Sequence, residues 1–257
     1  MNGISLEEWQ KTIGIWEKDG NILGVVNSEG EGEGEIFFQL AEIDIPEMIL
    51  EEMFDFAEEN TGGNRGNKRY IQMRIPAGDS KREAIAIKRG YRKANWEEWV
   101  SEIPVSRKVD ITLPEGFSIV DGSNLTDFEK GRAHARAFEY INKPIYKNRA
   151  IEAYKLLRQT PDYRFDLDLY IISDTGDVVS FTTIWYDSVN KIGILEPVGT
   201  VPEYRRRGLA SSVIGECIRR IEKEGAEKTY VWTNKEFYLS IGFEQKYKMN
   251  VWEKEIV

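Results

Sequence analysis

The strongest constraint on the fold is a long amphipathic helix that directly follows a strand and a basic loop. Residues 192–200 have the pattern of a strand, and Gly225 ends the helix. Such a helix must bury its apolar face against a sheet, so the segment predicts an α/β fold with a mixed sheet. Apolar side chains recur at the i, i+3, i+4 spacing of one helix face, at Ala210, Val213, Ile214, Cys217, Ile218 and Ile221.

Residues 103–116 interrupt the chain with two prolines and no helical period. Because 257 residues suit two ordinary domains, we place a domain boundary near Arg107. Beyond it, periodicity and turn residues predict alternating elements, with Asn124 or Thr126 capping the first helix. The expected strands cover 117–120, 167–172, 178–186, 192–200, 228–233 and 245–253, and the expected helices cover 127–140, 210–221 and 236–241.

The first half of the chain repeats part of this order. Two strands joined by a turn are expected within 14–26. The sequence around Gly90 is similar to the sequence around Gly242. Nothing before Ile13 is long enough to supply a first strand and helix, so the first copy is truncated. Its remaining expected elements are a strand at 36–40, a helix at 45–59 and a strand at 70–75.

Composition excludes several classes of protein. Hydrophobic residues make up 41% and charged residues 31% of the chain, which is enough apolar surface for a folded core. No apolar run approaches the roughly 18 residues of a membrane span, and the first residues lack a secretory signal, so we expect a cytoplasmic protein with no membrane partner. A net charge of −9 argues against nucleic acid as a partner and suits cationic molecules.

Two residue types are too rare for some kinds of site. Cys217 is the only cysteine and His134 the only histidine. They exclude an internal disulfide and a Cys/His zinc site, and we expect no metal. A Ser-His-Asp hydrolase would have to use His134. We interpret His134 as a structural histidine, with a base or acceptor-site role as the alternative, and Cys217 as a core residue.

The loop before the long helix has the properties of a phosphate-binding site. The first turn of a helix leaves backbone N–H groups unpaired at the positive end of the helix dipole. Gly208 and the small Ala210 allow a ligand to approach these groups. Arg205, Arg206 and Arg207 add charge and hydrogen-bond donors beside them. A solvated basic loop is the alternative interpretation of the three arginines.

Two short motifs resemble those of a known family. Arg205-x-x-Gly208-x-Ala210 follows a strand and resembles the acyl-CoA loop, Gln/Arg-x-x-Gly-x-Gly/Ala, of the GNAT N-acetyltransferase superfamily. Tyr238-x-x-x-Gly242, after the next strand, resembles the second signature of that family. The order of the expected elements after the domain boundary also matches the GNAT fold.

The resemblance implies a mixed twisted sheet of the GNAT acyltransferase type in two tandem units. Residues 1–107 would form a degenerate, truncated GNAT-like domain, and residues 108–257 an acetyl-CoA-binding catalytic domain. In the first copy the place of the phosphate loop is taken by a helix start with Asp44 as N-cap and Glu47 three residues later. These carboxylates would repel a pyrophosphate, so we expect this half to bind no CoA and to have a structural role.

The resemblance also implies a set of cofactor-binding residues for acetyl-CoA as co-substrate. Backbone amides of the loop and helix start would bind the pyrophosphate, and Asn234 would hydrogen-bond the pantetheine. The preceding strand would pair with the pantetheine arm, which requires it to diverge from its neighbour. Pro197 cannot donate to a ladder and lies where pairing should fail, or else it marks a bulge without a ligand. With Arg205 at the start of the motif, the residues of this set are Val198, Thr200, Arg205, Arg206, Arg207, Gly208, Leu209, Ala210 and Ser211.

Two residues are candidates for the chemistry of amine acetylation. Tyr238 corresponds to the family's tyrosine and would protonate the departing thiolate, since a phenol has a pKa of about 10; a core aromatic residue is the alternative. Glu196 is the candidate base for the incoming ammonium, with a water chain as the alternative. Period-two alternation places Glu196 on the same side of its strand as Val198 and Thr200.

Together these features predict an N-acetyltransferase that moves an acetyl group directly from acetyl-CoA to a primary amine. The acceptor would be a small molecule or peptide, such as a polyamine, an aminoglycoside or a lysine-like group. One competing function is a non-catalytic acyl-CoA-binding sensor or interaction module. Another is a nucleic-acid-binding protein that uses residues 205–207, which would show salt-dependent binding to DNA or RNA.

Overall fold

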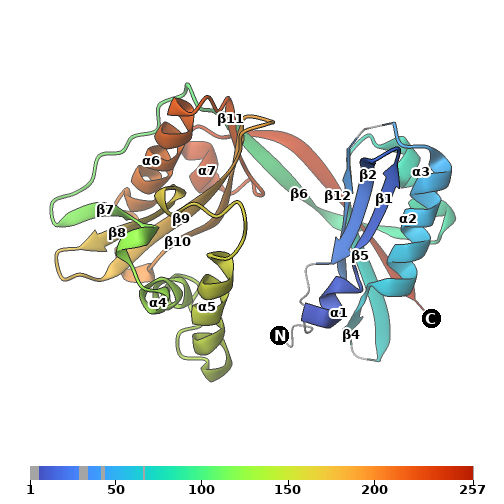
Figure 1. The fold of residues 1–257 in the computed structure, drawn as a ribbon, viewed down its shortest axis with the longest axis horizontal. Helices are drawn as coiled ribbons and strands as arrows, with labels where there is room; N and C mark the ends of the chain where they lie inside the picture. The colour runs from blue at the N-terminus through green and yellow to red at the C-terminus, as the bar shows by residue number, and fades with distance from the viewer. Residues whose placement is uncertain (1–5, 29–33, 42–43, 66, 257) are drawn as a thin grey trace. The chain divides into compact units, whose positions relative to one another are not determined.

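The computed structural model describes residues 6–28, 34–41, 44–65 and 67–256. The chain divides into two compact units (Figure 1). Unit 1 comprises Met1–Trp99 and Tyr247–Val257, and unit 2 comprises Val100–Lys246. The boundary lies before the one expected near Arg107, because Ser101–Pro104 pair with Lys228–Val231 in unit 2. The division of function between residues 1–107 and 108–257 stays a prediction.

Unit 2 is a twisted mixed sheet with helices on both faces. The strands β7, β8, β9 and β10 are antiparallel neighbours, and β11 joins β10 in parallel. The elements are β7 (Phe117–Asp121), α4 (Asp127–Ala137), α5 (Pro144–Leu157), β8 (Asp168–Ser173), β9 (Val178–Asp187), β10 (Ile192–Thr200), α6 (Leu209–Lys223), β11 (Lys228–Val231) and α7 (Glu236–Ser240), with 3-10 turns at Gly122–Asn124, Phe165–Leu167 and Pro202–Tyr204.

The two faces of this sheet carry separate apolar clusters. Helix α6 covers one face and buries the predicted apolar side, including Cys217, against β8 and β9. Helix α4 covers the other face, where Ala133 and Ala137 pack on Tyr170 and Phe181 (Figure 1). Thr126 caps α4 with a full capping box, one of the two caps expected. The interpretation of Cys217 as a core residue is confirmed.

Unit 1 repeats the later part of this order. In both copies three strands are followed by a helix, a strand, a second helix and a final 13-residue strand, and the first copy adds one short strand after its first helix. In the described part of unit 1, the short helix α1 is the only element ahead of the first strand. The elements are α1 (Leu6–Gln10), β1 (Gly14–Lys18), β2 (Asn21–Ser28), β3 (Glu35–Leu40), α2 (Glu47–Asn60), β4 (Gly63–Arg65), β5 (Lys68–Pro76), α3 (Ser80–Lys88), β6 (Arg92–Pro104) and β12 (Glu244–Ile256).

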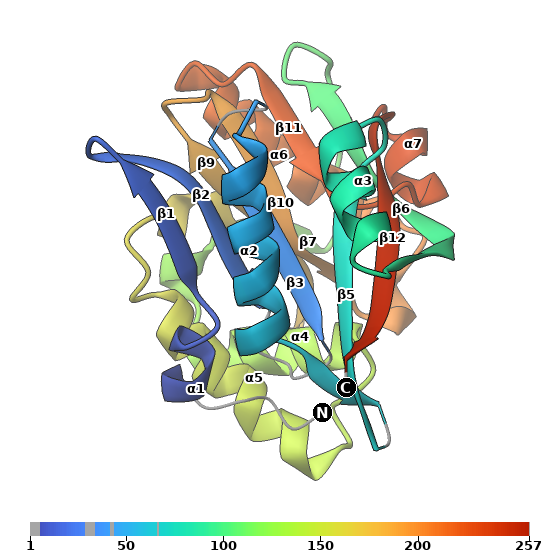
Figure 2. The same cartoon turned by 90° about the vertical axis from the view of Figure 1, so that its right-hand side faces the viewer.

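The final strand of each copy pairs outside its own repeat. The last strand of the chain, β12, pairs with β5 from Met249 to Ile256, whereas the end of β6 pairs with β11 from Ser101 to Pro104. In unit 1, α2 and α3 pack on the same face of the sheet, over a core that includes Phe54 (Figure 2).

The start of α2 differs from the prediction. Pro46, not Asp44, is the N-cap, and no side chain caps the helix. The Asp44 carboxylate instead forms an ion pair with Lys81, which lowers the pKa of that carboxyl chiefly through the hydrogen bond from Lys81. The cap was mispredicted because a lysine 37 residues away, brought close by the fold, competes for the carboxylate.

No helix in the described part of the chain is long and apolar enough to cross a membrane.

Candidate active site

The two parallel strands of unit 2 separate after a short stretch of pairing. Strands β10 and β11 are in register only from Ile192 to Ile194 on β10 and from Lys228 to Tyr230 on β11. Strand β10 continues to Thr200, and beyond Ile194 its only ladder partner among the described residues is β9. The second half of β10 therefore has one unpaired edge, as the pantetheine hypothesis requires.

The register with β9 identifies which backbone groups point to that edge. The Val201 amide donates to the Val179 carbonyl at 2.9 Å, and antiparallel pairs alternate between bonded and non-bonded positions. Gly199, opposite Phe181, is therefore a bonded position, whereas Val198 and Thr200 direct their N–H and C=O groups outward. These are the two residues predicted to pair with the ligand.

A β-bulge interrupts β10 at Glu196 and Pro197. Leu195 pairs with Ile184 and Val198 pairs with Thr182, so two residues of β10 lie opposite Thr183 alone. Pairing is interrupted at Pro197, as both interpretations of this proline require, and a ligand at this point stays a prediction.

The bulge also overturns the predicted orientation of Glu196. Leu195 and Val198 both belong to the cluster under α6, although period-two alternation would separate them. The extra residue shifts the alternation by one, so the exposed Glu196 lies on the opposite face of the sheet from Val198 and Thr200. The proposed role of Glu196 as a base does not depend on which face its side chain occupies, and it stays a prediction.

Helix α6 begins without a side-chain cap, at a glycine in the left-handed region. Gly208 is the N-cap with a φ of 78°, and the first amide to bond back to it is that of Ser212. The preceding N–H groups of the first turn have no acceptor among the described residues. Arg206 also has a positive φ, of 65°. Left-handed residues on both sides of Arg207 turn successive N–H groups toward one side, as in anion-binding nests.

The three arginines have different partners. Arg205 donates to the Thr200 carbonyl at 3.1 Å and to the Ala137 carbonyl at 2.8 Å, so its guanidinium ties the loop to β10 and to the end of α4. Arg207 lies 5.3 Å from the centre of the Tyr204 ring. The exposed Arg206 makes no hydrogen bond or ion pair with another described residue. Arg207 also donates to the Glu203 carbonyl at 3.3 Å, so Arg206 is the side chain left to approach a phosphate, with Arg207 beside it.

The remaining residues of the helix start offer main-chain groups. The Leu209 side chain is buried in the core and anchors the first turn. The Ser211 hydroxyl donates to the Gly208 carbonyl at 2.7 Å. The backbone amides of Leu209, Ala210 and Ser211 stay directed out of the helix end, at its positive pole.

Tyr238 and Asn234 lie beyond β11. Tyr238, on α7, is 9% exposed and packs against Phe237 and Phe243. Burial raises the pKa of its phenol to about 12, and its hydroxyl makes no hydrogen bond with a described residue. The strand expected to reach Thr233 ends at Val231, so the exposed Asn234 lies in the connecting loop.

His134 is a structural residue, as expected. Its ring stacks on Phe181 on β9, and Nδ1 shares a hydrogen bond with the Tyr140 hydroxyl. Burial lowers the pKa of the imidazole from 6.5 to about 4. The ring is therefore neutral at pH 7 and is a weak base there.

Burial of the His134 imidazole should make the free energy of unfolding depend on pH through this single residue. Between pH 6.5 and pH 4 the unfolded chain binds a proton at His134 that the folded chain does not, so the free energy of unfolding falls as the pH falls. Between pH 7 and pH 5 we expect the wild type to lose about 2 kcal/mol more than a His134→Phe variant. Urea unfolding at both pH values measures this; equal losses would contradict the buried state of the ring.

Two hydrogen bonds of the site could not be predicted from the sequence. Trp185 Nε1 donates to the Glu196 carbonyl at 2.8 Å, and Arg205 reaches Ala137, 68 residues away. Neither pair has a spacing that a motif would reveal, because only the fold brings the partners together. Among the described residues, no three His, Cys, Asp or Glu side chains gather as a metal site.

Parallel strands that diverge beside an uncapped helix start agree with the GNAT-type fold that the sequence resemblance implies. Residues 134–246 match the acetyltransferase (GNAT) family. The matched residues lie within unit 2, and the GNAT fold of that unit supports acyl transfer. No curated protein sequence matches the chain.

Solved structures share this fold at low sequence identity. A GCN5-related N-acetyltransferase from Sphaerobacter thermophilus is 17% identical, with a TM-score of 0.66 over 93% of this chain and 78% of that one. A tandem GNAT protein from the clavulanic acid biosynthesis pathway is 12% identical, with a TM-score of 0.68 over 96% and 84%. A functionally unknown conserved protein from Staphylococcus epidermidis is 10% identical, with a TM-score of 0.53 over 99% and 98%. These likenesses establish the fold alone.

Proposed function

We propose that this protein is an N-acetyltransferase that transfers an acetyl group directly from acetyl-CoA to a primary amine of a small cationic acceptor. The observation that carries the proposal is the continuity between two features. The unpaired edge of β10, with outward groups at Val198 and Thr200, leads through a short loop to the uncapped start of α6 at Gly208. One ligand with an amide-bearing arm and a pyrophosphate satisfies both sets of donors.

The proposed cofactor contacts follow from that geometry. The pantetheine arm pairs with the Val198 carbonyl and the Thr200 N–H on the edge that β11 leaves free, while the Thr200 carbonyl accepts from Arg205. The pyrophosphate lies against the amides around Gly208, with Arg206 and Arg207 beside it. Asn234 reaches the pantetheine from the loop after β11.

The proposed chemistry uses one acid, one base and one backbone donor. The amine nitrogen attacks the thioester carbonyl carbon after Glu196 has taken a proton from the ammonium. The outward N–H of Val198 stabilises the oxyanion. The carbon–sulfur bond then breaks, and the Tyr238 hydroxyl protonates the departing thiolate. The excess proton on the new amide nitrogen passes through solvent to the phenolate, which restores Tyr238. The pKa of about 12 keeps this phenol protonated at neutral pH, the form that an acid must have.

Charge favours a cationic acceptor. The chain carries a formal charge of −9, and Glu196 is exposed on the face of the sheet that lies away from α6. The net negative charge attracts an ammonium group over a long range, and the Glu196 carboxylate attracts it locally.

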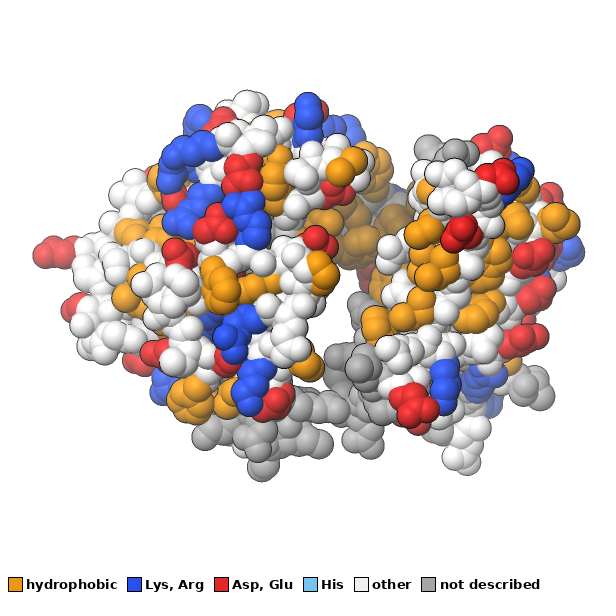
Figure 3. All heavy atoms as spheres, in the orientation of Figure 1, with side chains coloured by type: hydrophobic (Ala, Val, Ile, Leu, Met, Phe, Trp, Pro, Cys, Tyr) orange, Lys and Arg blue, Asp and Glu red, His pale blue; other side chains and the backbone are white. Residues whose placement is uncertain are grey.

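We propose that unit 1 binds no CoA and has a structural role. The start of α2 has Pro46 in place of a left-handed glycine, and Glu47 stands in the first turn. Acidic side chains also run along the right-hand edge of unit 1 in Figure 3. Negative charge at a helix start disfavours a pyrophosphate. In addition Ala86, four residues before Gly90, stands where Tyr238 stands four residues before Gly242.

Two measurements test the proposal in sequence. CoA should raise the melting temperature of the protein, because a ligand that binds only the folded state stabilises it. A thiol-release assay with acetyl-CoA should then find turnover with at least one member of a panel of polyamines, aminoglycosides and lysine-like amines. Binding without turnover across the panel would favour the acyl-CoA sensor, and the absence of both would contradict the proposed function.

A further inference from the structure

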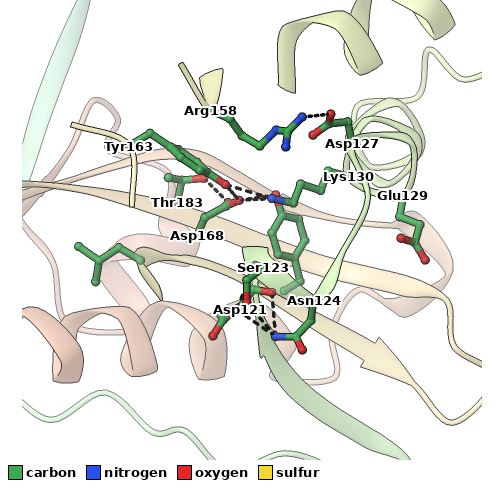
Figure 4. Close-up of polar contacts among 12 residues, drawn as sticks. Asp121, Ser123, Asn124, Asp127, Glu129, Lys130, Arg158, Tyr163, Asp168 and Thr183 are labelled. Carbon is green, nitrogen blue, oxygen red and sulfur yellow. Dashed lines mark hydrogen bonds and ion pairs between the residues drawn. The ribbon is translucent and has the colours of Figure 1, made fainter. Parts of the chain in front are cut away.

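A buried polar network lies between α4 and the sheet of unit 2, on the face away from α6. Its centre is the carboxylate of Asp168, at the start of β8 (Figure 4). Oδ2 accepts hydrogen bonds from Lys130 at 3.1 Å, from Tyr163 at 2.5 Å and from Tyr170 at 3.0 Å. Oδ1 accepts one from Thr183 at 2.7 Å. The Lys130 ammonium also contacts the Tyr163 hydroxyl at 3.0 Å.

The ion pair at the centre of this network is closed to water and tightly packed, whereas Tyr163 is partly exposed. The side chains of Lys130 and Asp168 are 0% and 1% exposed. A Cβ added to Gly122 would lie 2.6 Å from Asp168 Oδ2, so no larger residue fits there without displacing the carboxylate. A buried ion pair gives little net stability over apolar residues of the same size, yet it holds its partners in one geometry. The arrangement therefore suits a positioning role better than a stabilising one.

Two branches of the network lead to the bulge in β10. Thr183, bonded to Asp168, is the single residue of β9 opposite Glu196 and Pro197. On the second branch, the ring of Tyr163 packs against that of Trp185, with centroids 6.4 Å apart at 60°. Trp185 Nε1 in turn donates to the Glu196 carbonyl at 2.8 Å. A carbonyl inside the bulge thus has a side-chain donor where the ladder is interrupted.

We infer that Trp185 is a positioning residue, held by the Asp168–Lys130–Tyr163 network, that fixes the bulge and so aims both the Val198 amide and the Glu196 side chain. The inference rests on the proposed function for its catalytic consequence, because those two groups are the proposed oxyanion donor and base. Its structural part is independent of any ligand.

A Trp185→Phe variant tests the inference, because it keeps an aromatic ring against Tyr163 and removes the indole donor. We expect kcat for acetyl transfer to fall about tenfold, the equivalent of about one hydrogen bond, with KM for acetyl-CoA within twofold of the wild type. In the protein without ligand, the Gly199 amide, which bonds to β9 just past the bulge, should exchange its hydrogen about tenfold faster. Hydrogen exchange followed by NMR measures this directly.

Trp99→Phe is the matched control. Trp99 is also a partly exposed strand residue, and its Nε1 donates to Glu97 Oε1 at 3.1 Å, outside the network. The same substitution there should change neither kcat nor the exchange of the Gly199 amide. A second variant, Tyr163→Phe, removes the hydroxyl from Asp168 and keeps the ring against Trp185. It should speed the same amide exchange by a smaller factor.

The outcomes separate the inference from the proposed function. Unchanged exchange at Gly199 in Trp185→Phe overturns the inference, whatever the turnover. Faster exchange together with unchanged kcat also overturns it, because the bulge would then have no part in catalysis. Faster exchange in a protein whose wild type acetylates no amine supports the positioning of the bulge and overturns the proposed function instead.

Discussion

A Gly208→Glu variant is expected to lose almost all of the CoA-induced rise in melting temperature. Gly208 has a φ of 78°, where a residue with a Cβ costs about 1–2 kcal/mol. The loop relieves this strain by leaving the left-handed conformation, and the uncapped N–H groups then no longer point to one site. The new carboxylate also lies at the positive end of α6, where it takes the place of a phosphate.

The altered loop and the new charge together weaken the binding of CoA by about 2–3 kcal/mol, which raises its dissociation constant roughly 100-fold. At a CoA concentration of about 100 times the wild-type dissociation constant, the ligand stabilises the wild type by about 2.7 kcal/mol and the variant by about 0.4 kcal/mol. Thermal melts at several CoA concentrations, with calorimetric titration, measure the difference.

Gly225→Glu is the matched control for the backbone. Gly225 follows the other end of α6 with a φ of 94° and has no heavy atom within 4 Å of an added Cβ. At Gly208 the nearest such atom is the Ser211 hydroxyl, at 4.0 Å. The two substitutions therefore add the same strain and the same charge at opposite ends of one helix. An undiminished CoA shift in Gly208→Glu, or an equal loss in Gly225→Glu, would show that the pyrophosphate does not bind at residue 208.

The elements that sequence patterns predict well depend on residues a few positions apart. Helix α6 follows from apolar residues three and four apart, and its observed bounds, Leu209–Lys223, enclose the predicted ones. Thr126 and Glu129 form the capping box of α4 through a spacing of three residues. The glycine-containing loop before α6 is local in the same sense, which is why the position of the candidate phosphate site could be proposed from sequence.

The features that sequence patterns miss depend on partners far apart in the chain. The face of Glu196 is set by a bulge that only the register with β9 reveals. Arg205 has the charge of a phosphate ligand, but the fold directs its guanidinium to the Ala137 carbonyl. Lys130 and Asp168, separated by 38 residues, form a buried pair that no spacing rule predicts.

Replacing Tyr238 by Phe is expected to lower kcat for acetyl transfer by about 10²–10³-fold and to leave CoA affinity within about twofold. Losing a general acid in a proton-transfer step costs this much. The ring keeps its contacts with Phe237 and Phe243. Any fall in kcat therefore results from removal of the hydroxyl alone. That hydroxyl has no protein partner among the described residues, and its removal therefore leaves no buried donor or acceptor unsatisfied.

Tyr186→Phe is the control, because it removes a phenol whose hydroxyl donates to the Glu224 carbonyl at 3.1 Å. It should lower stability slightly and leave kcat unchanged.

The dependence of kcat on pH above neutrality gives a second test of the role of Tyr238 as an acid. A phenol with a pKa of about 12 stays protonated through the neutral range, so ionisation of Tyr238 should not reduce kcat below about pH 11. A loss of kcat near pH 9 that disappears in Tyr238→Phe would contradict the buried, protonated acid. An unchanged kcat in that variant would leave Tyr238 as a core aromatic residue and require another donor for the thiolate. A parallel loss of CoA affinity and kcat would likewise assign the ring to the binding of the coenzyme, because an acid that acts only as the carbon–sulfur bond breaks contributes nothing to ground-state binding.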